Sequence, residues 1–216
     1  MIEVHTKGRA AGLVPAAAFY PRLVVDLRYA GSRNFFGRAL YDRAEAWLLE
    51  GAARKLAAAA QAVAAAGYGL ALLDAYRPLR VQAAMWEILP DGDFVAPPER
   101  GSSHNRGAAV DVTLLGADGS PVPMPSEFDE FSERASHAYE GGPAAALEAR
   151  RFLRTCMEAA GFVAYEAEWW HYVDPEGRGR PLLDLSFDEL AEPAGPAELA
   201  ELAGPADGAA GGVYGR

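Results

Sequence analysis

The chain has 216 residues, of which 50% are hydrophobic and 23% are charged, and its formal net charge is −10. This composition is typical of a globular protein with room for one large domain or two small ones. The acidic balance argues against a nucleic-acid or anionic-membrane partner, because both require a basic surface. The single cysteine, Cys156, excludes an internal disulfide and a cysteine-rich zinc finger, and we expect it to be a buried thiol.

The N-terminal sequence does not have the pattern of a signal peptide. Pro15, Pro21 and Arg22 interrupt its apolar residues. No apolar run approaches the ~18 uncharged residues that a transmembrane helix needs. We therefore expect a cytoplasmic protein without a membrane partner. The sequence does not determine the oligomeric state and is compatible with a homo-oligomer.

The first half of the chain predicts two helices and a strand. A segment rich in Ala, Leu, Glu and Arg predicts a long helix from about residue 40 to about residue 66. The apolar run 68–76 predicts a buried strand, and Pro78 is expected at the first turn of the next helix. Residues 90–103 have the composition of a loop.

The second half predicts two more strands and one helix. The sequence AAVDVTLL (108–115) predicts a strand, and the turn-rich residues 116–126 are expected to connect a hairpin. A helix is predicted at about 143–160, followed by a strongly aromatic strand at 162–173.

These elements predict a single α+β domain over residues 1–190, with a central, mostly antiparallel sheet flanked by helices. Residues 191–216 are rich in Gly, Ala and Pro and have few large apolar side chains. We expect this segment to be a flexible tail.

A carboxylate interrupts the apolar strand at 108–115, and a histidine lies seven residues before it. In a strand, Asp111 shares its face with the small residues Ala109 and Thr113, which leave room for a ligand. Gly107 would allow a turn that brings His104 back over this face.

The second cluster of candidate residues is EAEWWHYV (166–173). In a regular strand Glu168 and His171 point to opposite faces, so the two act together only at a strand end, a bulge or a twist. With His104 and Asp111 they have the composition of an open catalytic zinc site, in which water takes the fourth position and Glu168 takes its proton. Each cluster taken alone is also compatible with a structural polar pair.

The pattern Ser102-x-His104-x-x-Gly107-x-Ala109-x-Asp111, followed by Glu168-x-Trp170-His171, resembles the signature of zinc D,D-peptidases related to D-Ala-D-Ala carboxypeptidases. Hedgehog-type signalling domains share the fold of that group. Within it the chain is most similar to the D-alanyl-D-alanine dipeptidases, the type associated with vancomycin resistance. The similarity covers about residues 20–175, in the ordered segments 26–37, 68–78, 102–114, 128–138 and 166–173.

The resemblance implies a role for each matching residue. His104, Asp111 and His171 match the ligands of one zinc ion, and Glu168 matches the general base and acid. Arg77 matches the arginine that polarises the scissile carbonyl and stabilises the oxyanion, a role in which a fixed cation is worth about 10²–10³-fold in rate.

Two further residues match positions that bind the ends of the substrate. Ser102 matches a residue that hydrogen-bonds the substrate carboxylate, and Asp129 a carboxylate that binds the free amino terminus. A dipeptidase must recognise both ends of a short zwitterion. A solvated acidic surface is the alternative for Asp129, because Glu127, Glu130 and Glu133 surround it.

The resemblance implies zinc-dependent hydrolysis of the D-alanyl-D-alanine dipeptide to two D-alanines. The alternatives are a D,D- or L,D-carboxypeptidase acting on peptidoglycan peptides and a non-catalytic zinc-binding interaction domain. A binding domain would need neither Glu168 nor Arg77, so both residues favour catalysis. The ligand types alone do not separate zinc from other divalent metals.

Overall fold

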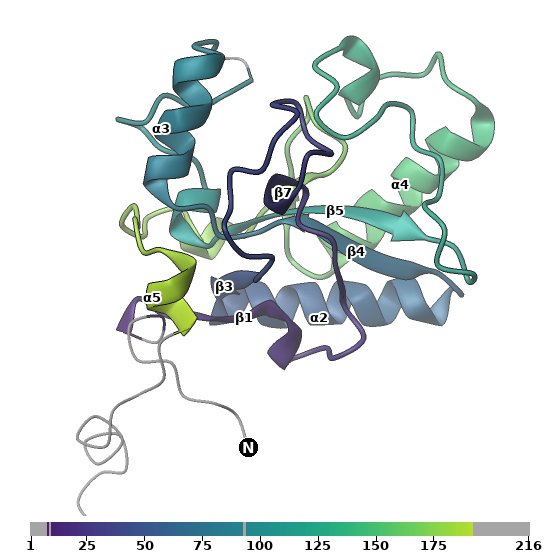
Figure 1. Cartoon of the computed structure of the whole chain (residues 1–216). Helices are drawn as coiled ribbons and strands as arrows, with labels where there is room; N and C mark the ends of the chain where they lie inside the picture. Colours follow the sequence, from purple (N-terminus) through teal and green to yellow (C-terminus); the bar gives the residue numbers. More distant parts are fainter. Residues whose placement is uncertain (1–7, 9, 93, 192–216) are drawn as a thin grey trace, which may run out of the picture.

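A five-stranded sheet in the order β2-β4-β5-β7-β6 occupies the centre of the computed structural model, which describes residues 8, 10–92 and 94–191 (Figure 1). Its strands are β2 (Val24–Val25), β4 (Gly69–Asp74), β5 (Ala109–Leu115), β6 (Val163–Ala164) and β7 (His171–Val173). β2 pairs with β4 in parallel, and the other neighbours pair antiparallel. A separate two-stranded sheet joins β1 (Leu13–Pro15) and β3 (Trp47–Leu49).

The described helices are α2 (Glu50–Ala65), α3 (Leu79–Ile88), α4 (Ala144–Ala159) and α5 (Phe187–Ala191). α2 and α4 pack against each other, and each contacts strands of the central sheet. In Figure 1, α2 runs below β4 and β5, whereas α3 and long irregular segments lie above them. This arrangement confirms the predicted α+β class with a mostly antiparallel sheet.

The two faces of β5 have different roles, as the alternation of its residues predicts. Val110, Val112 and Leu114 are completely buried in the hydrophobic core, which also contains Leu56 of α2 and Leu153 of α4. Each such side chain contributes about 1.5–3 kcal/mol by its burial. The other face of β5 carries Asp111 and is left for the polar groups of the site.

The predicted helix from residue 40 is wrong over residues 40–49, because α2 begins at Glu50. Trp47–Leu49 instead forms β3 and pairs with β1. The carbonyl of Trp47 also accepts a hydrogen bond of 2.9 Å from the backbone N–H of Tyr76. These partners are distant in sequence, so the local helix propensity of this segment does not reveal them.

The predicted single strand at 162–173 is also wrong. The chain makes a hairpin of β6 and β7, and residues 165–170 form the turns between them. The backbone N–H of Tyr165 donates to the carbonyl of His171 at 3.0 Å, and that of Glu168 donates to Tyr165 at 3.1 Å. Glu168 therefore lies in the turn and His171 begins β7, which is the strand-end geometry that the pair requires.

The remaining predicted elements are confirmed as β4, α3, β5 and α4, with small shifts at their ends. Cys156 is buried as expected, and burial raises the pKa of its thiol. The predicted tail begins at Ala191, the last residue of α5, and its residues 192–216 lie outside the described part of the chain. No helix among the described residues combines the length and apolarity that crossing a membrane requires.

Gly107 occupies a position that tolerates no side chain. Its φ angle is +67°, and a Cβ atom there would lie 2.4 Å from Leu13 Cδ2. We predict that Gly107→Ala lowers the free energy of unfolding by about 1 kcal/mol or more through backbone strain and by a further ~1–3 kcal/mol through overpacking. Urea denaturation measures the loss.

Gly119 is a matched control for this substitution. Its φ angle is +80°, but a Cβ atom there would meet nothing within 4 Å. Gly119→Ala should therefore show the backbone strain alone. If the two variants lose equal free energy of unfolding, the predicted clash with Leu13 is contradicted.

Candidate active site

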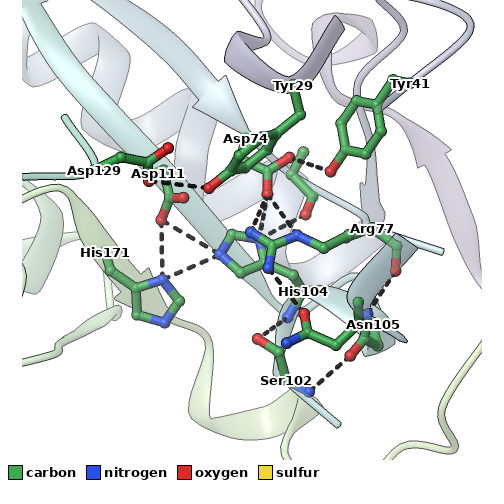
Figure 2. Close-up of polar contacts among 12 residues, drawn as sticks. Tyr29, Tyr41, Asp74, Arg77, Ser102, His104, Asn105, Asp111, Asp129 and His171 are labelled. Atoms are coloured by element: carbon green, nitrogen blue, oxygen red, sulfur yellow. Dashed lines mark hydrogen bonds and ion pairs between the residues drawn. The ribbon is translucent and has the colours of Figure 1, made fainter. Parts of the chain in front are cut away.

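The three side chains predicted to bind a metal ion meet at one point of the structure (Figure 2). His104 Nε2 lies 3.1 Å from His171 Nδ1 and 3.3 Å from Asp111 Oδ1. His171 Nδ1 lies 2.9 Å from the same carboxylate oxygen. His104, Asp111 and His171 thus form a group able to hold a metal ion.

The register of the sheet places two of these residues side by side. Asp111 of β5 pairs directly with His171 of β7, and directly opposed residues of antiparallel strands present their side chains on one face. His104 comes from the short 3₁₀ helix η3 (His104–Arg106), which ends at Gly107 just before β5. The left-handed conformation of Gly107 returns the chain to the sheet, as the sequence predicts.

A backbone carbonyl orients the ring of His104. Its Nδ1 lies 2.7 Å from the carbonyl oxygen of Ala75, the residue after β4. An imidazole that donates its Nδ1–H to a carbonyl presents Nε2 as a free lone pair. This tautomer is the one that a metal ion requires at Nε2.

The donor set fits a divalent transition metal. Two imidazole nitrogens and one carboxylate oxygen leave one position open in a tetrahedral site. With metal–ligand bonds of about 2.0–2.1 Å, ligand atoms of such a site lie about 3.3–3.4 Å apart. The observed separations of 2.9, 3.1 and 3.3 Å differ little from this spacing.

Electrostatics keep the buried carboxylate ionised. Burial opposes the charge on Asp111, yet His104 and His171 hold the pKa of Asp111 well below its usual range. Burial also opposes a charge on His104, while Asp111 and Asp74 raise the pKa of that imidazole. A metal ion binds neutral imidazole, so it would compete with protons for His104.

The metal-binding group lines a cavity of about 330 Å³. This volume is at the lower end of the roughly 300–1,000 Å³ of small-molecule sites, so the cavity suits a small ligand. Arg77, Ser102 and Glu168 line it as well. Six of the seven predicted site residues therefore surround one space: Arg77, Ser102, His104, Asp111, Glu168 and His171.

The carboxylate of Glu168 has no hydrogen bond or ion pair to another described side chain. It lies in the turn between β6 and β7, three residues before His171. Burial raises the pKa of Glu168 to about 7, because the neighbouring His171 only partly offsets the burial. A carboxylate with such a pKa exchanges protons readily near neutral pH.

Arg77 is buried, and several groups hold its guanidinium. Its Nε and Nη2 donate to Asp74 Oδ2 at 3.1 and 2.6 Å, and its Nη1 donates to Gln82 Oε1 at 2.9 Å. The guanidinium carbon lies 5.0 Å from the centre of the Tyr29 ring, a cation–π distance. Although burial opposes the charge, Asp74 keeps the pKa of Arg77 well above its usual value.

Ser102 lies at the start of the turn that contains His104. Its backbone N–H donates to Asn105 Oδ1 at 2.7 Å, and its Oγ accepts a bond of 3.3 Å from the backbone N–H of His104. Asn105 in turn donates to the carbonyl of Arg77 at 2.8 Å. Asn105 therefore links the turn of Ser102 and His104 to the segment that follows β4.

Asp129 differs from the other predicted residues, because it does not line the cavity. It is buried rather than part of a solvated acidic surface. Tyr29, which does line the cavity, donates its hydroxyl to Asp129 Oδ1 at 3.0 Å, and the backbone N–H of Phe35 donates to Oδ2 at 3.1 Å. Burial raises the pKa of Asp129 to about 6 despite these bonds.

Five polar residues around the site were not predicted from the sequence: Tyr29 and Gln82, which line the cavity, and Tyr41, Asp74 and Asn105, which lie behind it. One signal was available for Asp74, which ends the apolar run LALLDAY much as Asp111 interrupts AAVDVTLL. A carboxylate in an apolar run needs a buried partner. The other groups had no comparable signal.

A His–Asp–His group that shares a cavity with the Glu168 carboxylate and a buried arginine is typical of a metallopeptidase. Comparison with known proteins agrees. The sequence pattern of a family described as D-ala-D-ala dipeptidase matches residues 9–189. The chain belongs to this family and is a metallopeptidase.

Three relatives illustrate the match over most of their own length. The D-alanyl-D-alanine dipeptidase of Escherichia coli (strain K12) is 38% identical over 182 residues, which cover 84% of this chain and 94% of that protein. The D-alanyl-D-alanine dipeptidase of Enterococcus faecium is 39% identical over 185 residues, which cover 76% and 90% respectively. That of Enterococcus faecalis is 36% identical over 168 residues, which cover 68% and 83%.

We predict that His171→Ala raises the Kd for a divalent metal by about 100-fold or more, since losing a ligand costs at least as much as losing its supporting hydrogen bond. Titrating metal-free protein with Co²⁺ and recording its visible absorption measures this. His137→Gln is the control, because His137 is buried but lies outside the ligand group. Unchanged Co²⁺ binding by the His171 variant would refute the ligand set.

Proposed function

We propose that this enzyme hydrolyses the D-alanyl-D-alanine dipeptide to two D-alanines in a zinc-dependent reaction. The observation that carries the proposal is that one small cavity is lined by a group able to hold a metal ion, by Glu168 and by the tightly bonded Arg77. The names of the relatives supply the substrate. The residues around the cavity supply the chemistry.

His104, Asp111 and His171 would hold the zinc ion. When bound, zinc supplies a Lewis acid and lowers the pKa of a coordinated water towards about 7. The two imidazoles and the single carboxylate leave the site a net positive charge once it is loaded, which favours the binding of a carbonyl oxygen.

Glu168 acts as general base and then as general acid. It accepts a proton from the attacking water and delivers it to the nitrogen of the leaving D-alanine. Among the described residues no side chain is bonded to its oxygens, which leaves them available for this transfer. Burial favours the protonated form of Glu168, and this form donates to the leaving nitrogen, while the positive charge of a bound metal ion would favour the ionised form that accepts the first proton.

Arg77 stabilises the negative charge that develops on the carbonyl oxygen of the scissile bond. Its guanidinium is not deprotonated in proteins, so it carries its positive charge throughout the reaction. A cation that is already oriented needs no reorganisation as the charge develops, which is the main source of such stabilisation.

The two ends of the dipeptide carry opposite charges, and each end meets groups that favour its charge. Ser102 donates its hydroxyl to the substrate carboxylate, and the exposed Arg100 and Arg178 place positive charge at the same cavity. The carboxylate of Asp129 attracts the substrate ammonium. Because the hydroxyl proton of Tyr29 is committed to Asp129, the oxygen of Tyr29 remains an acceptor for that ammonium.

The alternative enzyme is a D,D- or L,D-carboxypeptidase on peptidoglycan peptides. Such an enzyme must accept an acylated residue in place of the free ammonium. The buried carboxylate of Asp129 near the cavity disfavours this substrate, because an acylated nitrogen carries no compensating charge. The cavity volume of about 330 Å³ also favours a dipeptide over a longer chain.

We predict that the zinc-loaded protein releases free D-alanine from D-Ala-D-Ala, and that a chelator abolishes the release. N-acetyl-D-Ala-D-Ala should be cleaved at least ~100-fold more slowly, because it lacks the ammonium that Asp129 attracts. Quantifying D-alanine in parallel reactions measures both rates. Comparable cleavage of the acetylated peptide would favour the carboxypeptidase, and no cleavage of either would favour the binding domain.

We predict that Glu168→Gln retains the metal but lowers kcat by about 10²–10⁴-fold, the usual contribution of general acid–base catalysis. Metal analysis and steady-state kinetics on the same sample separate the two effects. Glu166→Gln is the matched control in the same turn, where the carboxylate is exposed and pairs with Arg154 at 2.6 Å. A fully active Glu168 variant would sink the proposed mechanism.

A further inference from the structure

Asp74 is completely buried, and its two carboxylate oxygens serve different partners. Oδ2 accepts both the Nε–H and an Nη2–H of Arg77, and Oδ1 accepts the hydroxyl of Tyr41 at 2.7 Å. Oδ2 also lies 3.5 Å from Nδ1 of His104, the nitrogen that donates to the Ala75 carbonyl. Asp74 thus contacts both Arg77 and His104, one of the residues that could hold a metal ion (Figure 2).

A break in strand register aims Asp74 at the site. Along β4 and β5 the pairs run regularly to Leu72 and Val112, but Asp74 then pairs with Asp111. If the register continued unchanged, Asp111 would pair with Leu73. The side chain of Asp74 would then point to the same side of the sheet as that of Leu72, into the core. The extra residue reverses the face, which is the known effect of a β-bulge beside a functional site. Asp74, Asp111 and His171 therefore form one row across β4, β5 and β7.

The bonds to Asp74 and Gln82 use three of the five N–H groups of the Arg77 guanidinium. Gln82 is itself fixed, because its Nε2 donates to the carbonyl of Ala96 at 2.8 Å. Two N–H groups of Arg77 then remain for a ligand in the cavity that Arg77 lines.

The cavity contains other carboxylates that would attract a mobile arginine. Asp111 and Glu168 both line the cavity with Arg77. An ion pair between Arg77 and either of them would block a metal ligand or the proton acceptor. Asp74 already accepts two N–H groups of the guanidinium, and this anionic partner opposes such pairing.

We propose that Asp74 is a positioning residue for the reaction and that Gln82 assists it. Together they hold the Arg77 guanidinium in one orientation, away from Asp111 and Glu168, with two N–H groups directed at the developing oxyanion. This inference rests on the proposed function for the identity of the substrate. The placement of Arg77 by Asp74 does not depend on that substrate.

The first test compares Asp74→Asn with the wild type in the zinc-loaded enzyme. We expect kcat for D-Ala-D-Ala to fall by about 100-fold, as when an oxyanion donor is lost, with little change in KM or metal content. The Ki of a phosphinate analogue of the dipeptide should rise by the same factor as kcat/KM falls. Asp184→Asn is the matched control, because Asp184 pairs with Arg80 of α3 at 2.9 Å on the exposed surface. This variant should change neither kcat nor the Ki of the analogue.

A second experiment remains informative if the single variant folds poorly. Arg77→Ala, supplied with guanidinium ion, should regain activity about 10-fold or more if Asp74 captures and orients the added cation. Asp74→Asn combined with Arg77→Ala removes both buried charges, a change that folded proteins often tolerate, and should show no rescue. Equal rescue in both backgrounds, or unchanged kcat in Asp74→Asn, would overturn the proposal.

A readout independent of activity separates this inference from the proposed function. In ¹⁵N spectra, the Nε–H signal of Arg77, assigned with Arg77→Lys, should exchange slowly in the wild type and rapidly in Asp74→Asn. Inactive wild type with this difference would refute the substrate but retain the placement of Arg77. Equal exchange rates in wild type and variant would refute the placement itself.

Discussion

Buried charge is the constraint on which the arrangement of this protein depends. The ionisable groups at the cavity can be removed from water only when groups of opposite charge are buried with them. Asp74 is buried against Arg77, and Asp111 against His104 and His171. Removing one member of such a set leaves an uncompensated charge and costs several kcal/mol, whereas the whole set is close to balanced. The site is therefore a structural unit as well as a chemical one.

The sheet separates the requirements of stability from those of function. On one face, β5 contributes Val110, Val112 and Leu114 to the core that α2 and α4 share. On the other face, the row across β4, β5 and β7 carries the polar groups. Because a strand alternates its side chains, seven residues serve both purposes without a polar group entering the core.

Two corrections to the sequence interpretation have the same cause. Residues 40–49 favour a helix by composition, and residues 162–173 favour a strand, but neighbours distant in sequence decide both. β3 pairs with β1, and the turn at 165–170 is fixed partly by the bond from Trp169 to Ala135 at 2.8 Å. The second correction matters more, because only the turn brings Glu168 to the same cavity as His171.

The sequence by itself determined the fold class, through the order of its helices and strands. It also determined the family and a group of residues that can hold a metal ion, through residue types at fixed spacings near His104, Asp111 and His171. Only the tertiary structure decided how Arg77 is held and that Tyr29 stands between Asp129 and the cavity. The reason is physical. A β-bulge leaves no mark in a run such as LALLDAY, and hydrogen bonds between segments tens of residues apart depend on packing that no local pattern encodes.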